Sequence, residues 1–226
     1  MRIPITKYGL PQAVIYPGIC AVIMVLAAFT AFFSTALLIF SELIFGLILV
    51  WTLSFFRDPS RTVPKEKNLI LSPADGTITD IEIVDESNFI KGPATKIGIF
   101  LSVFNVHLNR MPCAVKVERI NYRKGAFINA MDPNCGKINE SNDLWLRRLN
   151  EPKDKILVRQ ISGAIARRIV CDAHAGQEFT GGQIFGMIKF GSRTELYLPA
   201  QSSAKVLVKN GDKVRAGLTV LAKYEC

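Results

Sequence analysis

Hydrophobic residues are distributed very unevenly along this chain. An almost uninterrupted apolar stretch runs from about Ala13 to Phe56. Only three residues of segment 1–56 are charged: Arg2, Lys7 and Glu42. One membrane helix needs about 20 apolar residues, so a stretch of this length accommodates two helices and a tight turn. The pattern predicts a membrane anchor in residues 1–56.

The anchor is predicted to be a helical hairpin that turns at Ser34-Thr35 or at Ser41-Glu42. Basic residues flank the apolar stretch on both sides: Arg2 and Lys7 before it, and Arg57, Arg61, Lys65 and Lys67 after it. Because positive flanks favour the cytoplasmic side, both ends of the hairpin are expected in the cytoplasm. One long tilted span, or two helices lying partly in the membrane interface, remain alternatives.

Beyond the anchor, short runs rich in Ile, Val and Phe alternate with Gly, Pro, Asn and Asp. This texture predicts many short strands, at Leu69–Leu71, Gly76–Val84, Lys96–Phe104, Val115–Tyr122, Lys155–Gln160, Ala164–Cys171, Thr194–Leu198, Ala204–Val208 and Leu218–Tyr224. Residues 57–226 are therefore expected to form a compact, mostly antiparallel β-domain. The polar segment 125–154 lacks clear periodicity and predicts a mobile loop with a short helix at Asp143–Leu149.

Charge and cysteine content narrow the functional classes. The 226 residues carry a net charge of +9, and residues 57–226 alone hold 26 basic and 18 acidic residues, a net charge of +8. A basic bias suits nucleic acid or an anionic membrane, and the adjoining apolar stretch favours the membrane over nucleic acid. Five scattered cysteines without a CxxC pair indicate reduced thiols in a cytosol-facing domain. With only two histidines, the sequence predicts no metal site.

Candidate chemistry centres on the dipeptide Gly191-Ser192, which lies between two apolar runs. Glycine lacks a Cβ, so its carbonyl can be approached closely and held in a strained conformation. The Ser192 hydroxyl is therefore positioned to attack the Gly191 carbonyl and move the acyl group from nitrogen to oxygen. Taken alone, such a dipeptide more often marks a tight turn or a bulge.

Two further residues extend this candidate site. His107 follows an apolar strand where the chain opens into a loop, and Asp75 lies in a Pro-Ala-Asp-Gly turn between two predicted strands. If both converge on Ser192, His107 would accept the hydroxyl proton and Asp75 would orient the imidazole. The other histidine, His174, is expected to be solvated.

Five ordered motifs between about residue 50 and residue 220 resemble the phosphatidylserine decarboxylase family, most closely its short, membrane-anchored branch. They are Phe56-Arg-Asp-Pro-Ser-Arg, Ser72-Pro-Ala-Asp-Gly, Phe104-Asn-Val-His-Leu-Asn-Arg-Met-Pro, Gly163-Ala-Ile-Ala-Arg-Arg-Ile-Val and Phe185-Gly-Met-Ile-Lys-Phe-Gly-Ser-Arg-Thr-Glu-Leu-Tyr-Leu-Pro. Their common order and compatible spacing make the signal much stronger than any one motif.

The resemblance implies autocatalytic cleavage between Gly191 and Ser192 into a large chain of residues 1–191 and a small chain of residues 192–226. Ser192 would become a pyruvoyl group, which forms a Schiff base with the amine of a serine phospholipid and serves as electron sink for decarboxylation. Strand pairing would hold the two chains together. The implied setting is phospholipid biosynthesis at the cell membrane with the catalytic domain in the cytoplasm, and a homodimer is compatible with it.

One motif departs from the larger bacterial branch of the family. The histidine motif there has a second histidine three residues after the first, and this chain has Arg110 at that position. Either His107 alone serves both cleavage and decarboxylation, or another group takes one role. Arg110 is a candidate ligand of the substrate carboxylate or phosphate, with a surface ion pair as its alternative. Arg57 and Arg61 are candidate contacts of the lipid phosphate.

Two alternative functions remain open from the sequence. Archaetidylserine, an ether-linked lipid, would present the same headgroup chemistry. The segment Val206–Val220 also resembles biotinyl/lipoyl-type β-domains, which suggests a membrane-anchored carrier or adaptor instead of an enzyme. Such a carrier needs a modifiable lysine at a hairpin tip, and Lys189 near Met187 is the nearest match.

Overall fold

A computed structural model describes residues 5–28, 34–164, 168–189 and 191–225. The chain divides into two compact units, residues 1–60 and residues 61–226. The first unit is helical, and the regular elements of the second are almost all β-strands. The prediction of a mostly β protein preceded by apolar helices is confirmed.

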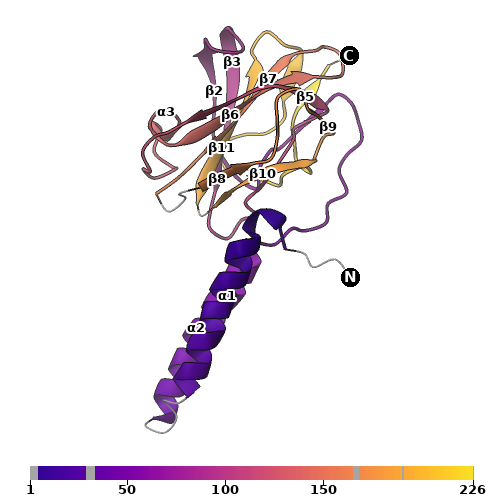
Figure 1. Cartoon of the computed structure of the whole chain (residues 1–226). Helices are drawn as coiled ribbons and strands as arrows, with labels where there is room; N and C mark the ends of the chain where they lie inside the picture. Colours follow the sequence, from indigo (N-terminus) through magenta and orange to yellow (C-terminus); the bar gives the residue numbers. More distant parts are fainter. Residues whose placement is uncertain (1–4, 29–33, 165–167, 190, 226) are drawn as a thin grey trace. The chain divides into compact units, whose positions relative to one another are not determined.

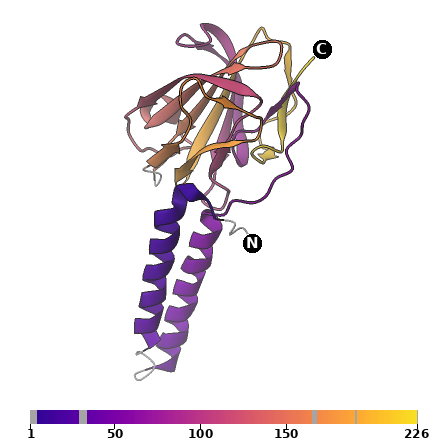
Figure 2. The same ribbon diagram turned by 45° about the vertical axis from the view of Figure 1, so that its right-hand side comes forward.

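The first unit contains a short 3-10 turn, η1 (Lys7–Gly9), and the helices α1 (Leu10–Ala28) and α2 (Thr35–Phe55). Ser34 caps α2 by accepting a hydrogen bond from the Leu37 amide at 3.4 Å, so this helix begins where one of the two predicted turns would end. The two helices lie side by side (Figures 1 and 2). Both are long and apolar enough to cross a membrane, and most of their large apolar side chains are exposed within this unit.

Within its described residues, the second unit contains fourteen strands and the short helix α3 (Cys135–Ile138). The strands are β1 (Leu69–Leu71), β2 (Gly76–Glu86), β3 (Gly92–Leu101), β4 (Leu108–Arg110), β5 (Val115–Arg123), β6 (Ser141–Arg148), β7 (Lys155–Ile161), β8 (Arg168–Cys171), β9 (Glu178–Phe179), β10 (Ile184–Lys189), β11 (Ser192–Pro199), β12 (Ala204–Val206), β13 (Lys213–Val214) and β14 (Val220–Tyr224). All of the strand pairs that form the sheets are antiparallel.

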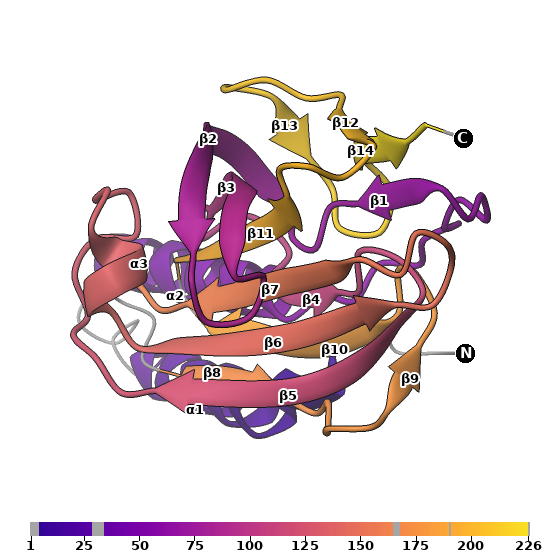
Figure 3. The ribbon, with the colours of Figure 1, turned by 90° about the horizontal axis from the view of Figure 1, so that it is seen from above.

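These strands form one large sheet and two small ones. The large sheet has eight strands in the order β13-β2-β3-β11-β7-β6-β5-β9, and the small sheets have the orders β4-β10-β8 and β1-β14-β12. Figure 3 shows β5, β6 and β7 running side by side, with β11 beyond β7. A core of Ile, Leu and Val side chains, including Ile97, Val158 and Leu196, is fully buried.

Strand β11 is central to the large sheet, because it pairs with β3 on one side and β7 on the other. The chain after residue 191 contributes three more strands. Of these, β13 pairs with β2 and β14 pairs with β1. Residues 192–226 are thus joined by strand pairing to three separate parts of the preceding chain.

The helix predicted at Asp143–Leu149 is wrong, because this segment lies in strand β6. Leu144 and Leu146 are fully buried, while the alternate residues Asp143 and Trp145 lie on the other face of the sheet. Pairing with β5 and β7 along its whole length fixes the segment as a strand. Segment 125–154 is therefore not one long loop.

Candidate active site

Gly191 and Ser192 lie at the start of β11, the central strand. Gly191 has φ +64°, a left-handed conformation in which a side chain would be strained. Gly163, which follows β7, packs directly against the Gly191 carbonyl oxygen, and a Cβ at residue 163 would collide with that oxygen. Glycine at both positions therefore allows the tight approach of two backbones at the candidate cleavage site.

The Ser192 side chain is fully buried, and its Oγ has no hydrogen-bond partner among the described residues. A buried hydroxyl without a partner costs about 1–3 kcal/mol. Such groups are rare in folded proteins and often have a role beyond stability.

His107 lies against the same dipeptide. Its Nε2 is 3.3 Å from the Gly191 amide nitrogen, which donates a hydrogen bond to it. Its Nδ1 is 2.9 Å from the carbonyl oxygen of Asn105. Since a carbonyl oxygen only accepts, Nδ1 carries the proton and Nε2 presents its lone pair to the dipeptide. The imidazole is completely buried, and its tautomer is set by these two contacts.

The loop before His107 is itself well ordered. The Asn105 side-chain oxygen accepts hydrogen bonds from both the amide and the hydroxyl of Ser102, each at 2.8 Å. The Asn105 amide in turn donates to the Ser102 carbonyl. These contacts fix the carbonyl that holds His107. The prediction missed Asn105 because its contribution is a backbone atom, which leaves no signature in the sequence.

Asp75 has different partners from the one predicted. Its carboxylate accepts two hydrogen bonds from Arg61, at 2.6 and 2.8 Å, and one from the Ala216 amide at 2.8 Å. No hydrogen bond of Asp75 to His107 occurs among the described residues. A two-pronged guanidinium contact is a stronger competitor than a single imidazole N–H. The carbonyl of Asn105 occupies the orienting position instead.

The three candidate arginines are held in different ways. Arg110 lies on β4, is buried, and donates to the Gly182 carbonyl at 3.0 Å. Arg57 donates to the carbonyl and hydroxyl of Ser54 at the end of α2. Arg61 faces Asp75, and its side chain is only 5% exposed. Its guanidinium is therefore occupied within the protein instead of being presented to solvent.

A row of amide side chains lies beside the site on the inner face of the large sheet. Asn109 donates to the Thr194 hydroxyl at 3.1 Å and accepts from Gln160 at 2.9 Å, and Gln160 accepts from Asn142 at 3.1 Å. All four residues are buried. They connect β4, β11, β7 and β6 close to Ser192, and no pattern in the sequence indicated this connection.

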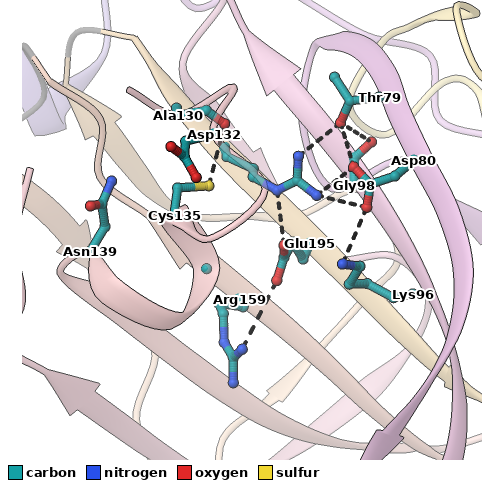
Figure 4. A network of polar contacts seen from close by, with 12 residues as sticks. Thr79, Asp80, Lys96, Gly98, Ala130, Asp132, Cys135, Asn139, Arg159 and Glu195 are labelled. Atoms are coloured by element: carbon teal, nitrogen blue, oxygen red, sulfur yellow. Dashed lines mark hydrogen bonds and ion pairs between the residues drawn. The ribbon is translucent and has the colours of Figure 1, made fainter. Parts of the chain in front are cut away.

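Charged side chains cover the opposite face of β11 (Figure 4). Arg193 donates to both carboxylate oxygens of Asp80, at 2.6 and 2.8 Å, and to Glu195 at 2.8 Å. Burial by itself raises the pKa of Asp80, but hydrogen bonds from Arg193 and Thr79 lower it below its usual value. The residue directly after Ser192 is thus tied to β2.

Comparison with known proteins identifies the family of this chain. A family model described as phosphatidylserine decarboxylase matches residues 48–222. A protein of Carboxydothermus hydrogenoformans is 45% identical over 179 residues, which cover 79% of this chain and 82% of that protein. A relative from Rhodopirellula baltica is 40% identical over 99% of this chain and 89% of its own length. One from Desulfotalea psychrophila is 41% identical over 98% of this chain and 97% of its own length.

All three relatives are named phosphatidylserine decarboxylase proenzyme. The family match contains both the His107 loop and the Gly191-Ser192 dipeptide, whose contact the structure describes. This chain therefore belongs to the phosphatidylserine decarboxylase family.

Proposed function

We propose that the chain is a proenzyme that cleaves itself between Gly191 and Ser192, and that the mature enzyme decarboxylates phosphatidylserine to phosphatidylethanolamine. The proenzyme names of its relatives support the first step. The observation that carries the proposal is the lone pair of His107 Nε2, 3.3 Å from the Gly191 amide, beside a buried serine hydroxyl without a partner.

Cleavage begins with addition of the Ser192 hydroxyl to the Gly191 carbonyl carbon, while His107 Nε2 takes the hydroxyl proton. The carbon–nitrogen bond then breaks as the nitrogen receives that proton, which leaves an ester between Gly191 and Ser192 Oγ. Loss of the Ser192 α-proton expels Gly191 as a carboxylate. Water replaces the nitrogen of the remaining fragment, so ammonia departs and residue 192 becomes a pyruvoyl group.

The surroundings of Ser192 fit a pyruvoyl group. A pyruvoyl group is small and planar. It would replace the Ser192 side chain, whose oxygen has no hydrogen-bond partner among the described residues. It would remain at the start of β11, which pairs with a strand on each side. Its carbonyl supplies an electrophile for the substrate amine and an acceptor for the electron pair left when carbon dioxide departs. His107 is the group positioned to move protons at this residue.

Positively charged side chains are the candidates for contacts with the anionic groups of the substrate. Arg110, three residues after His107, is a candidate for binding the substrate carboxylate or phosphate, and Arg57 for contacting a lipid phosphate. Arg61 is already paired with Asp75, which favours a role in ordering the linker. Asp75 would then act as a positioning residue that joins Arg61 to Ala216 of the small chain.

The helices α1 and α2 are proposed to anchor the enzyme in the cell membrane, with the catalytic unit in the cytoplasm as the basic flanks indicate. A lipid substrate is then available in the same membrane. A carrier function is less well supported, because Lys189 is buried in strand β10 instead of standing at an exposed hairpin tip. The contacts of the site concern the headgroup, so diacyl and ether-linked lipids are both candidate substrates.

Denaturing gels and mass spectrometry of the purified protein test this function. The wild-type protein is expected to yield a large chain of residues 1–191 and a small chain with a blocked first residue, in place of one band at 25.1 kDa. Ser192→Ala is expected to remain whole and to release no carbon dioxide from phosphatidylserine. An uncleaved wild-type protein, or a decarboxylating Ser192→Ala variant, would contradict the proposal. Assays with diacyl and ether-linked lipids would identify the preferred substrate.

A further inference from the structure

Buried side-chain atoms without hydrogen-bond partners cluster beside Ser192. Among the described residues four such atoms occur: Glu140 Oε2, Arg148 Nε, Ser162 Oγ and Ser192 Oγ. Three of the four are oxygens: Ser192 begins β11, Ser162 directly follows β7, and Glu140 directly precedes β6. Buried polar atoms are normally satisfied, so a group of three calls for a physical explanation.

Strand register places these three oxygens in one row. Ile161 of β7 pairs with Arg193 of β11 on one side and with Ser141 of β6 on the other. Continuing the same register by one residue gives a row across three neighbouring segments: Glu140, Ser162 and Ser192. The Ser162 amide donates to the Glu140 carbonyl at 2.9 Å, so the antiparallel pairing continues to this row.

The three side chains share the inner face of the sheet. Residues two positions apart on a strand point to the same face. Thr194 and Gln160, two positions from Ser192 and Ser162, both bond Asn109 on the inner face. Glu140 lies two positions before Asn142, which bonds Gln160 on that face.

The row is also compact. The backbone of Ser162 bonds on its β6 side, since its carbonyl accepts from the Asn139 side chain at 2.8 Å and its amide donates to Glu140. Ser162 and Ser192 therefore form a non-hydrogen-bonded pair, in which Cα atoms lie about 4.5 Å apart and side chains are closest. On the far side, Tyr122 donates to Glu140 Oε1 at 2.7 Å and so fixes the carboxylate.

Among the described residues, this row lacks a cation that would match its carboxylate, and its two serine hydroxyls donate to none of these oxygens. A carboxylate oxygen only accepts hydrogen bonds, and a hydroxyl oxygen has two lone pairs. Other buried carboxylates of the large sheet are matched to arginines: Asp143 to Arg159, and Glu195 to Arg193. In the part of the chain that the structure describes, Glu140 Oε2 has no such cation. A primary ammonium group, with three N–H donors and a positive charge, complements a carboxylate and a hydroxyl oxygen in chemistry and in charge.

We propose that Glu140 Oε2 and Ser162 Oγ form a subsite for the primary ammonium group of the substrate headgroup, beside residue 192. The proposal rests on the proposed function, because a serine phospholipid must bring its amine to that residue. Glu140 and Ser162 would hold the nitrogen there, while His107 approaches the dipeptide through Gly191. The subsite would favour lipids with a primary amine over lipids that carry the same phosphate group but no amine.

Binding of short-chain lipids to the cleaved full-length enzyme in detergent tests the subsite. The probes are dihexanoyl phosphatidylethanolamine, which has the amine, and dihexanoyl phosphatidylglycerol, which lacks it. Isothermal titration calorimetry compares the cleaved fractions of wild type, Glu140→Gln and Ser162→Ala. The matched control is Glu118→Gln, since Glu118 is a partly exposed carboxylate paired with Arg147 on β6.

Wild type and Glu118→Gln are expected to bind the amine lipid at least about tenfold more tightly than phosphatidylglycerol. Glu140→Gln is expected to lose most of this preference, and Ser162→Ala part of it, with phosphatidylglycerol binding unchanged. If Glu140→Gln yields no cleaved protein, Ser162→Ala alone decides. The subsite would be overturned if both variants kept the wild-type preference for the amine lipid. Where Glu140→Gln is not cleaved, an unchanged preference in Ser162→Ala would overturn it. A wild-type protein that never cleaves would instead refute the proposed function.

Discussion

At the residue scale, the protonation pattern of His107 is central to the site. Its Nδ1 donates to a carbonyl oxygen and its Nε2 accepts a hydrogen bond from the Gly191 amide, so the lone pair of the imidazole lies at the proposed cleavage dipeptide. His107→Gln is expected to slow self-cleavage about 10²- to 10⁴-fold, the usual contribution of a positioned base. Time courses on denaturing gels after cell-free synthesis measure this rate.

The matched control for that variant is His174→Gln, because His174 is exposed and is the only other histidine. It is expected to cleave at the wild-type rate. Cleavage of His107→Gln at the wild-type rate would remove His107 from the mechanism.

Gly163 gives a second prediction at this scale. A Cβ at this position would collide with the Gly191 carbonyl oxygen, which belongs to rigid backbone. Gly163→Ala is therefore expected to displace the attacked carbonyl and to slow cleavage at least about tenfold, as small misplacements at a reacting centre do. Gly92→Ala serves as control, because a Cβ there meets no atom within 4 Å. Equal cleavage rates in both variants would show that the close approach is not needed.

At the scale of elements, strand β11 links the two chains that cleavage would produce. Cleavage would free the first residue of this strand. Contacts of its side chains, as well as pairing with β3 and β7, would then hold the strand in the sheet. Arg193 holds Asp80 of β2 at 2.6 and 2.8 Å. Asp80→Asn is expected to release the small chain from the cleaved enzyme at a lower urea concentration than in wild type. Retention of the small chain on a tagged large chain measures this, with Glu118→Gln as the exposed control.

The same contact predicts a pH dependence. Burial opposes ionisation of Asp80, but Arg193 and Thr79 outweigh it and hold its pKa below 3.8. A lowered folded-state pKa adds stability above the unfolded value, and this stability is lost as the pH falls through the folded value. Small-chain retention is thus expected to weaken below about pH 4, and less so in Asp80→Asn. An identical acid profile in both proteins would exclude Asp80 as the titrating group.

At the scale of the whole molecule, the two apolar helices and the small chain belong to opposite ends of the sequence. Both candidate membrane spans precede residue 56, whereas residues 192–226 are joined to the rest by strand pairing. Concentrated urea is expected to release the small chain from membranes while the large chain sediments with them. In Ser192→Ala the whole chain should sediment. A small chain that stays with the membrane in urea would indicate an attachment of its own.

Much of this architecture was predictable because it depends on local composition. The apolar stretch of residues 13–56 predicts two helices, since a helix satisfies its backbone hydrogen bonds within one segment. The short runs of Ile, Val and Phe determine a β-domain. Strand β6 was missed because its outward residues include the charged Asp143 and Arg147 and the large apolar Trp145, which conceal the inward alternation of Leu144 and Leu146.

The sequence by itself determined the fold class and predicted the chemistry of the site, because Gly191-Ser192 and His107 lie in motifs that can be read locally. Only the tertiary structure decided their partners. Asn105 orients the imidazole through a backbone atom, Arg61 occupies Asp75, and the register of three strands aligns Ser162 and Glu140 with Ser192. The first contact depends on backbone geometry and the other two join different segments of the chain, and neither backbone geometry nor strand register has a local signature.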